Sequence, residues 1–427
     1  MAGNEAGALS GLKVVEIAQG WAGPLASVLL ADFGADVVKV ESIQRLDWWR
    51  GAAAGADDGF THERSWFYNG INRNKSGITL DLTQPRGREL LLDLVRGADV
   101  FIENFTSHVV HQLRLSHEDL MAVNPRLITV SMPAYGSDGA WADLPALGTT
   151  VESMCGLQSL TGYEGGPPRI QGTSWDPVIG LHAAFAILAA MNRRRATGLG
   201  QHIEVSHIEA GTQLVAGPLL EYLLAGRVPP RRGNSDRTYA PHGCYPAEGD
   251  EQWVTIVARN DAEWAALGRV LDPEGALQRP EFLTVESRLE HRPELDDALL
   301  RLTSRHSKEH LFERLQAAGV PCGPVSSPAD LLADPQLAAR DFFVPMERAF
   351  VGMHLYTGSW IRMGRNSARF ERPAPTLGQD NEAILAGRLG LSSAELAELA
   401  AAGIIGTRPV PAQADRQASG TETGRQS

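Results

Sequence analysis

The sequence contains few cysteines, and none of them forms a recognisable motif. Cys155, Cys244 and Cys322 are the only three among 427 residues. No C-x-x-C pair occurs, so neither a disulfide framework nor a structural zinc site is expected. Sparse, unpaired cysteines are typical of a reducing compartment, and we therefore expect a cytoplasmic protein.

The sequence also lacks a segment that could cross a membrane or direct secretion. Its longest apolar stretch, residues 178–191, is interrupted by His182, and a spanning helix needs about 20 apolar residues. The first residues, MAGNEAGALSG, have neither the basic start nor the apolar core of a signal peptide. A net charge of −12 disfavours attraction of the whole surface to nucleic acid or to anionic lipid. Neither is expected as a partner, and an anionic small molecule would need a local basic pocket.

Three common catalytic signatures are absent or incomplete. No G-x-x-x-x-G-K-[ST] loop occurs, so an ATP site of that kind is not indicated. GTSWD at 172–176 approaches the G-x-S-x-G turn of serine hydrolases, but Asp176 replaces its second glycine. His306 and His310 share a helix face without the H-E-x-x-H register or a third ligand. They indicate a solvated helix surface, and no metal site is expected.

The first 200 residues contain alternating strand and helix patterns. A helix led by Pro24 lies between the first two expected strands, and a Gly34 stop ends it. The expected strands are LKVVEIA (12–18), VVKVE (37–41), ITLDL (78–82), ADVFIENF (98–105) and RLITVSM (126–132). This alternation predicts an α/β fold with an open, Rossmann-like parallel sheet.

Changes in composition divide the rest of the chain. We expect a large α/β domain over 1–205, a linker over 206–235 rich in Pro, Gly and Arg, and a smaller α+β domain over 236–325. Residues 326–406 would form a second linker and return to the large domain. Residues 407–427 are poor in apolar side chains and would form a disordered tail.

The first turn between strand and helix permits a dinucleotide-binding interpretation. Glu41 ends the second strand about 20 residues after this turn, as the ribose-binding acid does in that fold. The turn contains only Gly20 and Gly23, however, and Pro24 removes an N–H group that would face a pyrophosphate. An NAD(P)-dependent oxidoreductase is therefore the less favoured alternative.

Asp176 has two compatible interpretations. It precedes Pro177 and a long apolar run, and Asp at the N-cap followed by Pro is a common start of a helix. A carboxylate at a helix N-terminus also stays ionised in the field of the helix dipole. An ionised, positioned carboxylate beside Trp175 can act as a nucleophile. The local pattern does not choose between the cap and the nucleophile.

Seven segments occur in an order that resembles the class III (family III) CoA-transferases. They are GLKVVEIAQGWAGPLASVLLADFGADVVKVE, NRNKSGITLDL, ADVFIENF, NPRLITVSMPAYG, GGPPRIQGTSWDPVIGLHAAFAILAAMNRRRATGLGQHIEVS, APHGCYPAEGD with ARNDAEW, and PAPTLGQDNEAIL. This family includes formyl-CoA:oxalate, carnitine and bile-acid CoA-transferases and the related α-methylacyl-CoA racemases. The resemblance extends from about Gly11 to about Gly390.

The resemblance places the family's catalytic aspartate on Asp176. It implies that this carboxylate attacks an acyl-CoA thioester and then carries CoA as an aspartyl-CoA thioester until an acceptor acid removes it. One thioester is exchanged for another, so neither ATP nor a tightly bound cofactor is needed, and acyl-CoA is a substrate.

The resemblance also implies contacts to the substrate from four segments. Gln19, Gly20, Trp21 and Ala22 would line the acyl pocket; Asn72, Arg73, Asn74 and Lys75 would approach the nucleotide; Asn104 and Phe105 would lie at the adenine and ribose; Tyr135 would be an active-site tyrosine. Arg73 and Lys75 would supply positive charge for the phosphates. Gln112 and Pro133 stand where the formyl-CoA enzyme has Arg and Lys, so phosphate recognition differs there.

Four tryptophans in the first part of the chain bear on the choice of acid. Trp21, Trp48, Trp49 and Trp66 suggest a pocket for a bulky or aromatic acyl group, although the same residues could belong to the core.

Family members form interlocked, ring-like homodimers, and the resemblance implies such a dimer here. The racemase or isomerase activity of some relatives remains the alternative function. Those relatives carry a histidine where this chain has ALGTTVES (146–153). Racemisation by proton exchange needs a base on each face of the α-carbon, and this segment does not supply the second one. Transfer is therefore favoured.

Overall fold

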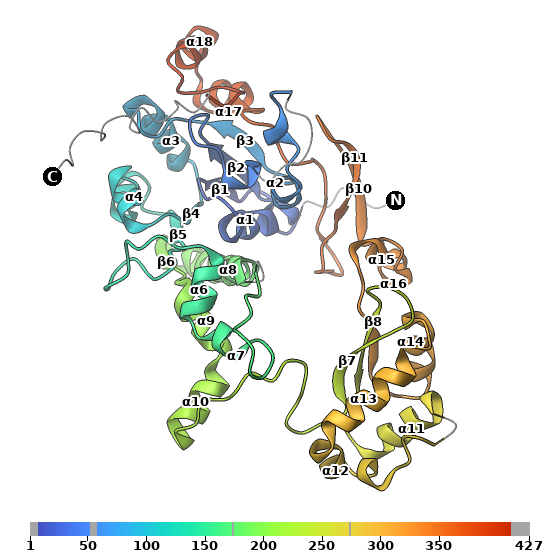
Figure 1. The fold of residues 1–427 in the computed structure, drawn as a ribbon. Helices are drawn as coiled ribbons and strands as arrows, with labels where there is room; N and C mark the ends of the chain where they lie inside the picture. Colours follow the sequence, from blue (N-terminus) through green and yellow to red (C-terminus); the bar gives the residue numbers. More distant parts are fainter. Residues whose placement is uncertain (1–6, 52–57, 173–174, 273–274, 411–427) are drawn as a thin grey trace, which may run out of the picture. The chain divides into compact units, whose positions relative to one another are not determined.

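The computed structural model describes residues 7–51, 58–172, 175–272 and 275–410 (Figure 1). These residues form two compact units. The first comprises residues of 1–155, 171–215 and 341–427, and the second comprises residues 156–170 and 216–340. The domain limits expected from composition stay a prediction.

A parallel sheet of six strands forms the centre of the first unit. Its order is β3-β2-β1-β4-β5-β6. The strands are β1 (Lys13–Glu16), β2 (Asp36–Glu41), β3 (Ser76–Thr79), β4 (Val100–Glu103), β5 (Ile128–Ser131) and β6 (Gln201–Glu204). The predicted α/β fold with a parallel sheet is therefore confirmed. From β1 the chain proceeds to β2 on one side and later to β4 on the other, so the carboxyl ends of β1 and β4 mark the switch point where such sheets bind ligands.

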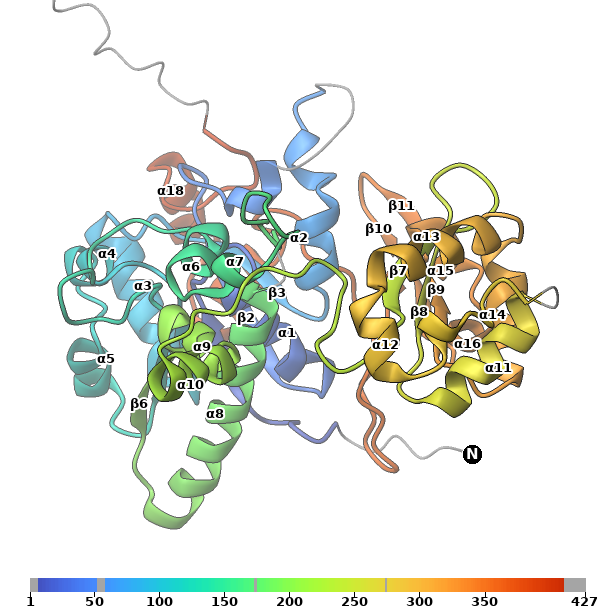
Figure 2. The ribbon, with the colours of Figure 1, turned by 60° about the horizontal axis from the view of Figure 1, so that its bottom comes forward.

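Helices cover both faces of this sheet, because alternate strand residues point to opposite sides. Val14 belongs to a core shared with α1 (Ala22–Asp32) and α8 (Trp175–Thr197). The next residue, Val15, belongs to a second core, which includes α3 (Pro85–Arg96) and α17 (Asn381–Leu389). Figure 1 and Figure 2 show α1 on one face and α3 with α17 on the other.

Helices α1 and α8 approach each other closely. A Cβ atom on Gly180 would stand 2.6 Å from the carbonyl oxygen of Ala22, so only glycine fits there. The long apolar run of the sequence thus forms a core helix. No helix among the described residues has both the length and the apolarity needed to cross a bilayer.

The remaining elements of the first unit are short. The helices are α2 (Trp66–Ile71), α4 (Ser107–Gln112), α5 (His117–Val123), α6 (Gly148–Met154), α9 (His207–Leu214) and α18 (Ser393–Ala401), with 3₁₀ turns at Trp48–Gly51 and Thr61–Glu63. Strands β10 (Phe343–Arg348) and β11 (Gly352–Thr357) pair in an antiparallel hairpin.

The C-terminal part of the chain closes the outer edge of the sheet at β3. The backbone N–H of Gly77 donates to Asp380 Oδ2 at 2.7 Å, and that of Thr79 donates to Asn381 Oδ1 at 2.8 Å. The hydroxyl of Thr79 donates to the carbonyl of Gly406. Edge groups of β3 are therefore satisfied by residues about 300 positions later in the sequence.

The second unit has its own antiparallel sheet and core. Its strands β7 (His242–Pro246), β8 (Trp253–Val257) and β9 (Cys322–Pro324) pair in that order. Trp264, Phe282 and Leu299 are among the residues that fill its core. The helices of this unit are α7 (Leu157–Leu160), α10 (Ala216–Ala225), α11 (Asp261–Leu271), α12 (Val285–Glu290), α13 (Arg292–Thr303), α14 (Lys308–Ala317), α15 (Pro328–Leu332) and α16 (Pro335–Ala339), with a 3₁₀ turn at Pro280–Phe282.

Candidate active site

Two loops meet at the switch point of the sheet and are tied together by hydrogen bonds. The backbone N–H of Gln19 donates to Asn104 Oδ1 at 2.9 Å, and the Asn104 amide donates to the Gln19 carbonyl at 2.7 Å. Gly20 has a φ of +72°, which favours glycine, and its N–H donates to Asp47 Oδ1. The loops after β1 and β4 are thus held in one arrangement.

A cavity of about 320 Å³ opens beside these loops. Six of the twelve residues predicted from the sequence line it: Gln19, Trp21, Ala22, Asn104, Phe105 and Asp176. Gly20 and Tyr135 are not among the described residues of its wall, although both stand close in sequence to residues that are. Sequence reasoning missed other wall residues, among them Arg45, Leu147, Gly148, Val151 and His207.

Asp176 lies in the first turn of α8, which begins at Trp175. This corrects the expectation that Asp176 precedes the helix as its N-cap. Burial, together with the negative charge of Glu152, raises the pKa of Asp176 to about 6. These two effects on the pKa of Asp176 outweigh the helix dipole, which was expected to keep that pKa low. At pH 7 the ionised carboxylate is still the main form. A desolvated carboxylate on a cavity wall is a suitable nucleophile.

Aromatic side chains build one side of the cavity. Trp48 lines it together with Trp21 and stacks on Trp49 with ring centroids 4.3 Å apart. Trp49 is buried and stacks in turn on Phe67 at 4.0 Å. Trp66 is 59% exposed and is not among the described residues of the wall. Two of the four tryptophans thus face the cavity, and Trp49 supports them from behind.

The INRNK segment is engaged inside the protein. Lys75 is fully buried and donates to Glu16 Oε2 at 2.9 Å, to the Pro24 carbonyl and to Asn72 Oδ1. Arg73 forms a bidentate pair with Asp32.

Asn74 belongs to the same internal network. It has a φ of +60°, and its side-chain amide donates to Asp32 Oδ1. None of Asn72, Arg73, Asn74 and Lys75 is among the described residues that line the cavity with Asp176. The side chains predicted to meet the nucleotide are therefore occupied by contacts within the fold.

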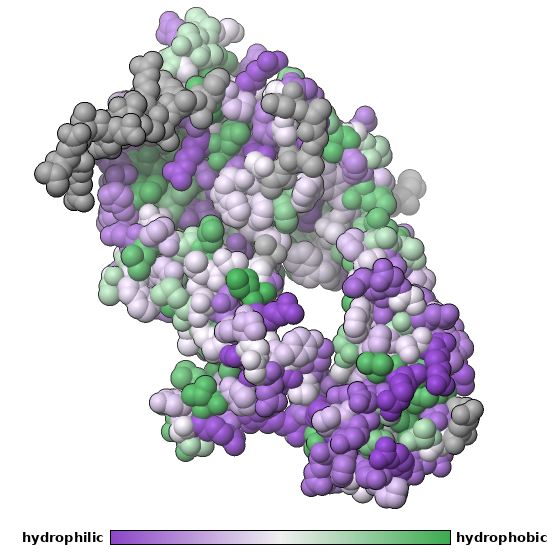
Figure 3. All heavy atoms as spheres, viewed as in Figure 1, coloured by the Kyte–Doolittle hydropathy of each residue, from purple (hydrophilic) through white to green (hydrophobic). Residues whose placement is uncertain are grey.

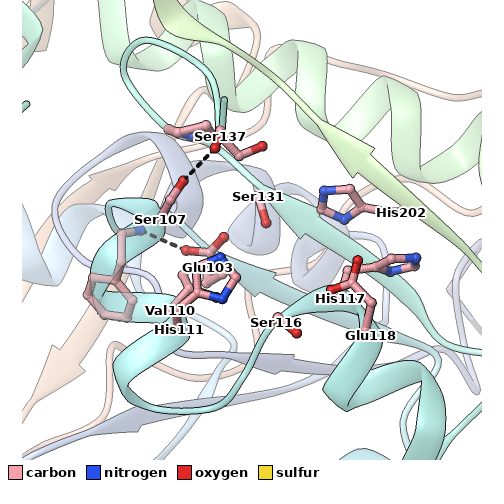
Figure 4. Close-up of a pocket in the computed structure, with 12 residues that line it drawn as sticks. Glu103, Ser107, Val110, His111, Ser116, His117, Glu118, Ser131, Ser137 and His202 are labelled. Atoms are coloured by element: carbon pink, nitrogen blue, oxygen red, sulfur yellow. Dashed lines mark hydrogen bonds between the residues drawn. The ribbon is translucent and has the colours of Figure 1, made fainter. Parts of the chain in front are cut away.

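Figure 4 shows a second cavity, of about 260 Å³. Phe105 is among the residues that line both cavities. Burial raises the pKa of Glu103, in the wall of the second cavity, to about 7. The hydroxyl of Thr129 lies 3.0 Å from His117 Nδ1 and 2.9 Å from His202 Nδ1. No group of three or more His, Cys, Asp or Glu residues in the described part of the chain is arranged to hold a metal ion.

The model of CoA-transferase family III matches residues 9–381 of this chain. Succinate–glutarate CoA-transferase of Agrobacterium fabrum is 32% identical over 383 residues, which are 88% of this chain and 95% of that protein. Succinyl-CoA–D-citramalate CoA-transferase of Chloroflexus aurantiacus is 31% identical, covering 93% and 98% of the two chains. Formyl-CoA:oxalate CoA-transferase of Streptomyces avermitilis is also 31% identical, covering 93% and 99%. Among solved structures, a CAIB/BAIF family protein from Brucella suis superposes with a TM-score of 0.81 at 31% identity, covering 90% of this chain and 100% of that one.

Proposed function

Because this chain belongs to CoA-transferase family III, whose members transfer CoA between acids, we propose that Asp176 is the residue that carries CoA. The observation that supports this most directly is the place of its carboxylate. It lies at the start of α8, on the wall of the cavity that opens at the switch point of the sheet.

The reaction begins when an Asp176 oxygen adds to the carbonyl carbon of an acyl-CoA thioester. The C–S bond breaks and CoA leaves as a thiolate, so that Asp176 and the acyl group form a mixed anhydride. The thiolate sulfur then adds to the Asp176 carbonyl carbon, and the donor acid leaves as a carboxylate. Asp176 now holds CoA as a thioester.

The second half repeats these steps in reverse. An acceptor carboxylate attacks the aspartyl-CoA thioester and expels the thiolate, which then attacks the acyl carbonyl of the new anhydride. A new acyl-CoA leaves and the Asp176 carboxylate is restored. No proton is transferred, so the protein needs only to position these groups and to stabilise the oxyanions. The side-chain amide of Gln19, on the same wall, is the donor that we propose for an oxyanion.

The size of the cavity supports a short acid as the transferred group. About 320 Å³ is near the lower limit for ligand sites. The relatives described above act, by their names, on succinate, glutarate, citramalate and oxalate. Arg45 on the wall would attract an anionic end of such a substrate, and the flat faces of Trp21 and Trp48 would also accept an aromatic acid.

We also propose that the protein functions as a homodimer. Helix α8 exposes Leu181, Phe185 and Leu188, and Phe185 is 75% exposed. In the second unit, α10 has no buried residue and exposes Leu220 and Leu224; Figure 3 shows apolar side chains gathered over it. Apolar helix faces of this kind indicate a surface that another chain covers. Light scattering should give twice the chain mass of 46.1 kDa, and a monomer at micromolar concentration would contradict the dimer.

Mass analysis of the peptide that contains Asp176 tests the proposed carrier. After incubation with a panel of acyl-CoA donors, including succinyl, oxalyl, propionyl and phenylacetyl thioesters, the peptide should gain the mass of CoA less water. Hydroxylamine should remove the adduct, and Asp176→Ala should abolish it. The exposed Asp138 provides a matched control, since Asp138→Ala should leave the adduct unchanged. No adduct with any donor would exclude Asp176 as the carrier.

A further inference from the structure

Asp47 is a buried carboxylate between two segments that line the cavity of Asp176. It lies after β2 and directly before the 3₁₀ turn at Trp48–Gly51, and it is not among the described residues of the cavity wall. Its Oδ2 lies 3.0 Å from Lys39 Nζ, and both side chains are fully buried. A buried ion pair often adds little net stability, so its place beside a reactive cavity points to another role.

One oxygen of Asp47 joins the two segments. Its Oδ1 accepts from the backbone N–H of Gly20 at 3.1 Å and from that of Trp49 at 3.0 Å. The indole of Trp48 lies directly against Gly20, since a Cβ atom there would stand 2.5 Å from Trp48 Nε1. The loop after β1 and the tryptophan turn are therefore held together, and Asp47 is the side chain to which both are bonded.

The ion pair also fixes the backbone around Gln19, the proposed oxyanion donor. In the peptide group before it, the Ala18 carbonyl accepts from Lys39 Nζ at 2.8 Å, and the N–H donates to Asn104. In the peptide group after it, the carbonyl accepts from Asn104 and the N–H donates to Asp47. Both peptide groups are thus bonded at both ends. Because the backbone is fixed, the side-chain amide of Gln19 is restricted to a few rotamers at the cavity.

We propose that Asp47 is a positioning residue for the transfer of CoA. It holds the Gln19 amide and the Trp48 ring in place on the cavity wall and does not itself touch the substrate. This inference rests on the proposed function, because these positions matter for the reaction only if Asp176 is the nucleophile. Donors that are held in place beforehand need no reorganisation when the oxyanion forms. Loss of Asp47 should therefore slow the chemical step itself.

Single-turnover formation of the aspartyl-CoA adduct separates positioning from stability. With saturating amounts of the donor that labels the wild type fastest, the first-order rate constant does not depend on how much of the protein is folded, whereas the amplitude does. Asp47→Ala removes the acceptor, and Asp47→Asn keeps an oxygen in the place of Oδ1. Asp32→Ala is the matched control, because Asp32 is a buried carboxylate paired with Arg73 at the last residue of α1, whereas the cavity lies at the first.

Asp47→Ala should lower the rate constant about tenfold or more, because small misplacements of reacting groups have large effects on rate. Asp47→Asn should recover most of this loss, since it can still accept from both N–H groups. Asp32→Ala should lower the amplitude or the unfolding temperature and leave the rate constant unchanged.

The inference is overturned if Asp47→Ala keeps the wild-type rate constant, if Asp47→Asn folds and is equally slow, or if Asp32→Ala slows the reaction by the same factor. Should Asp47→Ala not fold, Asp47→Ser takes its place, because the serine hydroxyl is too short to reach both N–H groups. Failure of both to fold would assign Asp47 to stability alone and would also overturn the inference. A wild type that forms no adduct counts against the proposed function instead.

Discussion

The carboxylate of Asp176 lies against the first residue of α6. A Cβ atom on Gly148 would stand 2.8 Å from Asp176 Oδ1, which is closer than van der Waals contact allows. Gly148 does not have a positive φ, so the backbone conformation at this position does not require glycine. The absence of a side chain leaves room for the nucleophile.

Gly148→Ala should therefore displace the Asp176 carboxylate. We expect at least a tenfold slower formation of the aspartyl-CoA adduct, because small misplacements of a reacting group have large effects on rate. Gly387→Ala is the matched control, since Gly387 lies in α17 and a Cβ there meets nothing within 4 Å. A Gly148→Ala variant that forms the adduct at the normal rate would show that the carboxylate has room to move.

The rate of adduct formation should depend on pH through Asp176. Its pKa is about 6, and only the ionised form attacks, so the rate should fall about tenfold between pH 7 and pH 5. Glu152→Gln removes the neighbouring negative charge that contributes to this raised pKa. The acid limb of the profile should then shift to lower pH. Glu209→Gln, at an exposed position of α9, should leave the profile in place; identical profiles for all three proteins would contradict the coupling.

Asp176→Asn should stabilise the fold while it abolishes transfer. The pKa of Asp176 rises on folding from 3.8 to about 6, so the native state holds its proton more tightly than the unfolded state. The free energy of unfolding therefore decreases as pH rises from about 4 to 6, and the whole cost is present above pH 7. At pH 8 the substitution should add about 1–3 kcal/mol. At pH 4 the two proteins should unfold at nearly the same temperature, and an equal gain at both pH values would contradict this origin.

Lys75→Met should affect stability more than substrate binding. Glu16, which Lys75 contacts at 2.9 Å, is fully buried, and within the described part of the chain it would retain only Lys39 as an ion-pair partner. Removal of one partner from a buried pair costs about 3 kcal/mol. At a temperature where the variant is folded, KM for acyl-CoA should equal that of the wild type and of the surface control Lys13→Met. A stable variant with a raised KM would instead restore Lys75 as a CoA ligand.

The sequence was sufficient to predict the parallel sheet, because apolar strands alternate with helices. It did not predict the order of the strands. Because β4 lies beside β1 in that order, Gln19 and Asn104, 85 residues apart, can bond each other. The place of Asp176 required the resemblance to a family, because the local pattern of a helix start does not distinguish a cap from a nucleophile.

Other features depend on contacts that no local pattern contains. The local sequence INRNK does not indicate whether its Arg and Lys side chains face solvent or the core. Their direction is set by Glu16 and Asp32, which lie 59 and 41 residues before Lys75 and Arg73. His207 was missed for a similar reason, since a histidine at the start of a short helix has no signature until the fold places it beside Asp176.

The closing of the sheet edge by the C-terminus has a consequence for synthesis on the ribosome. Strand β3 is completed by Asp380, Asn381 and Gly406, so more than 300 residues must be translated before the first unit can be finished. At about 5–20 residues per second, this takes tens of seconds. The second unit ends at Arg340, so all of it is translated earlier. The first unit contains the first strands to be translated and is nevertheless the last to be completed.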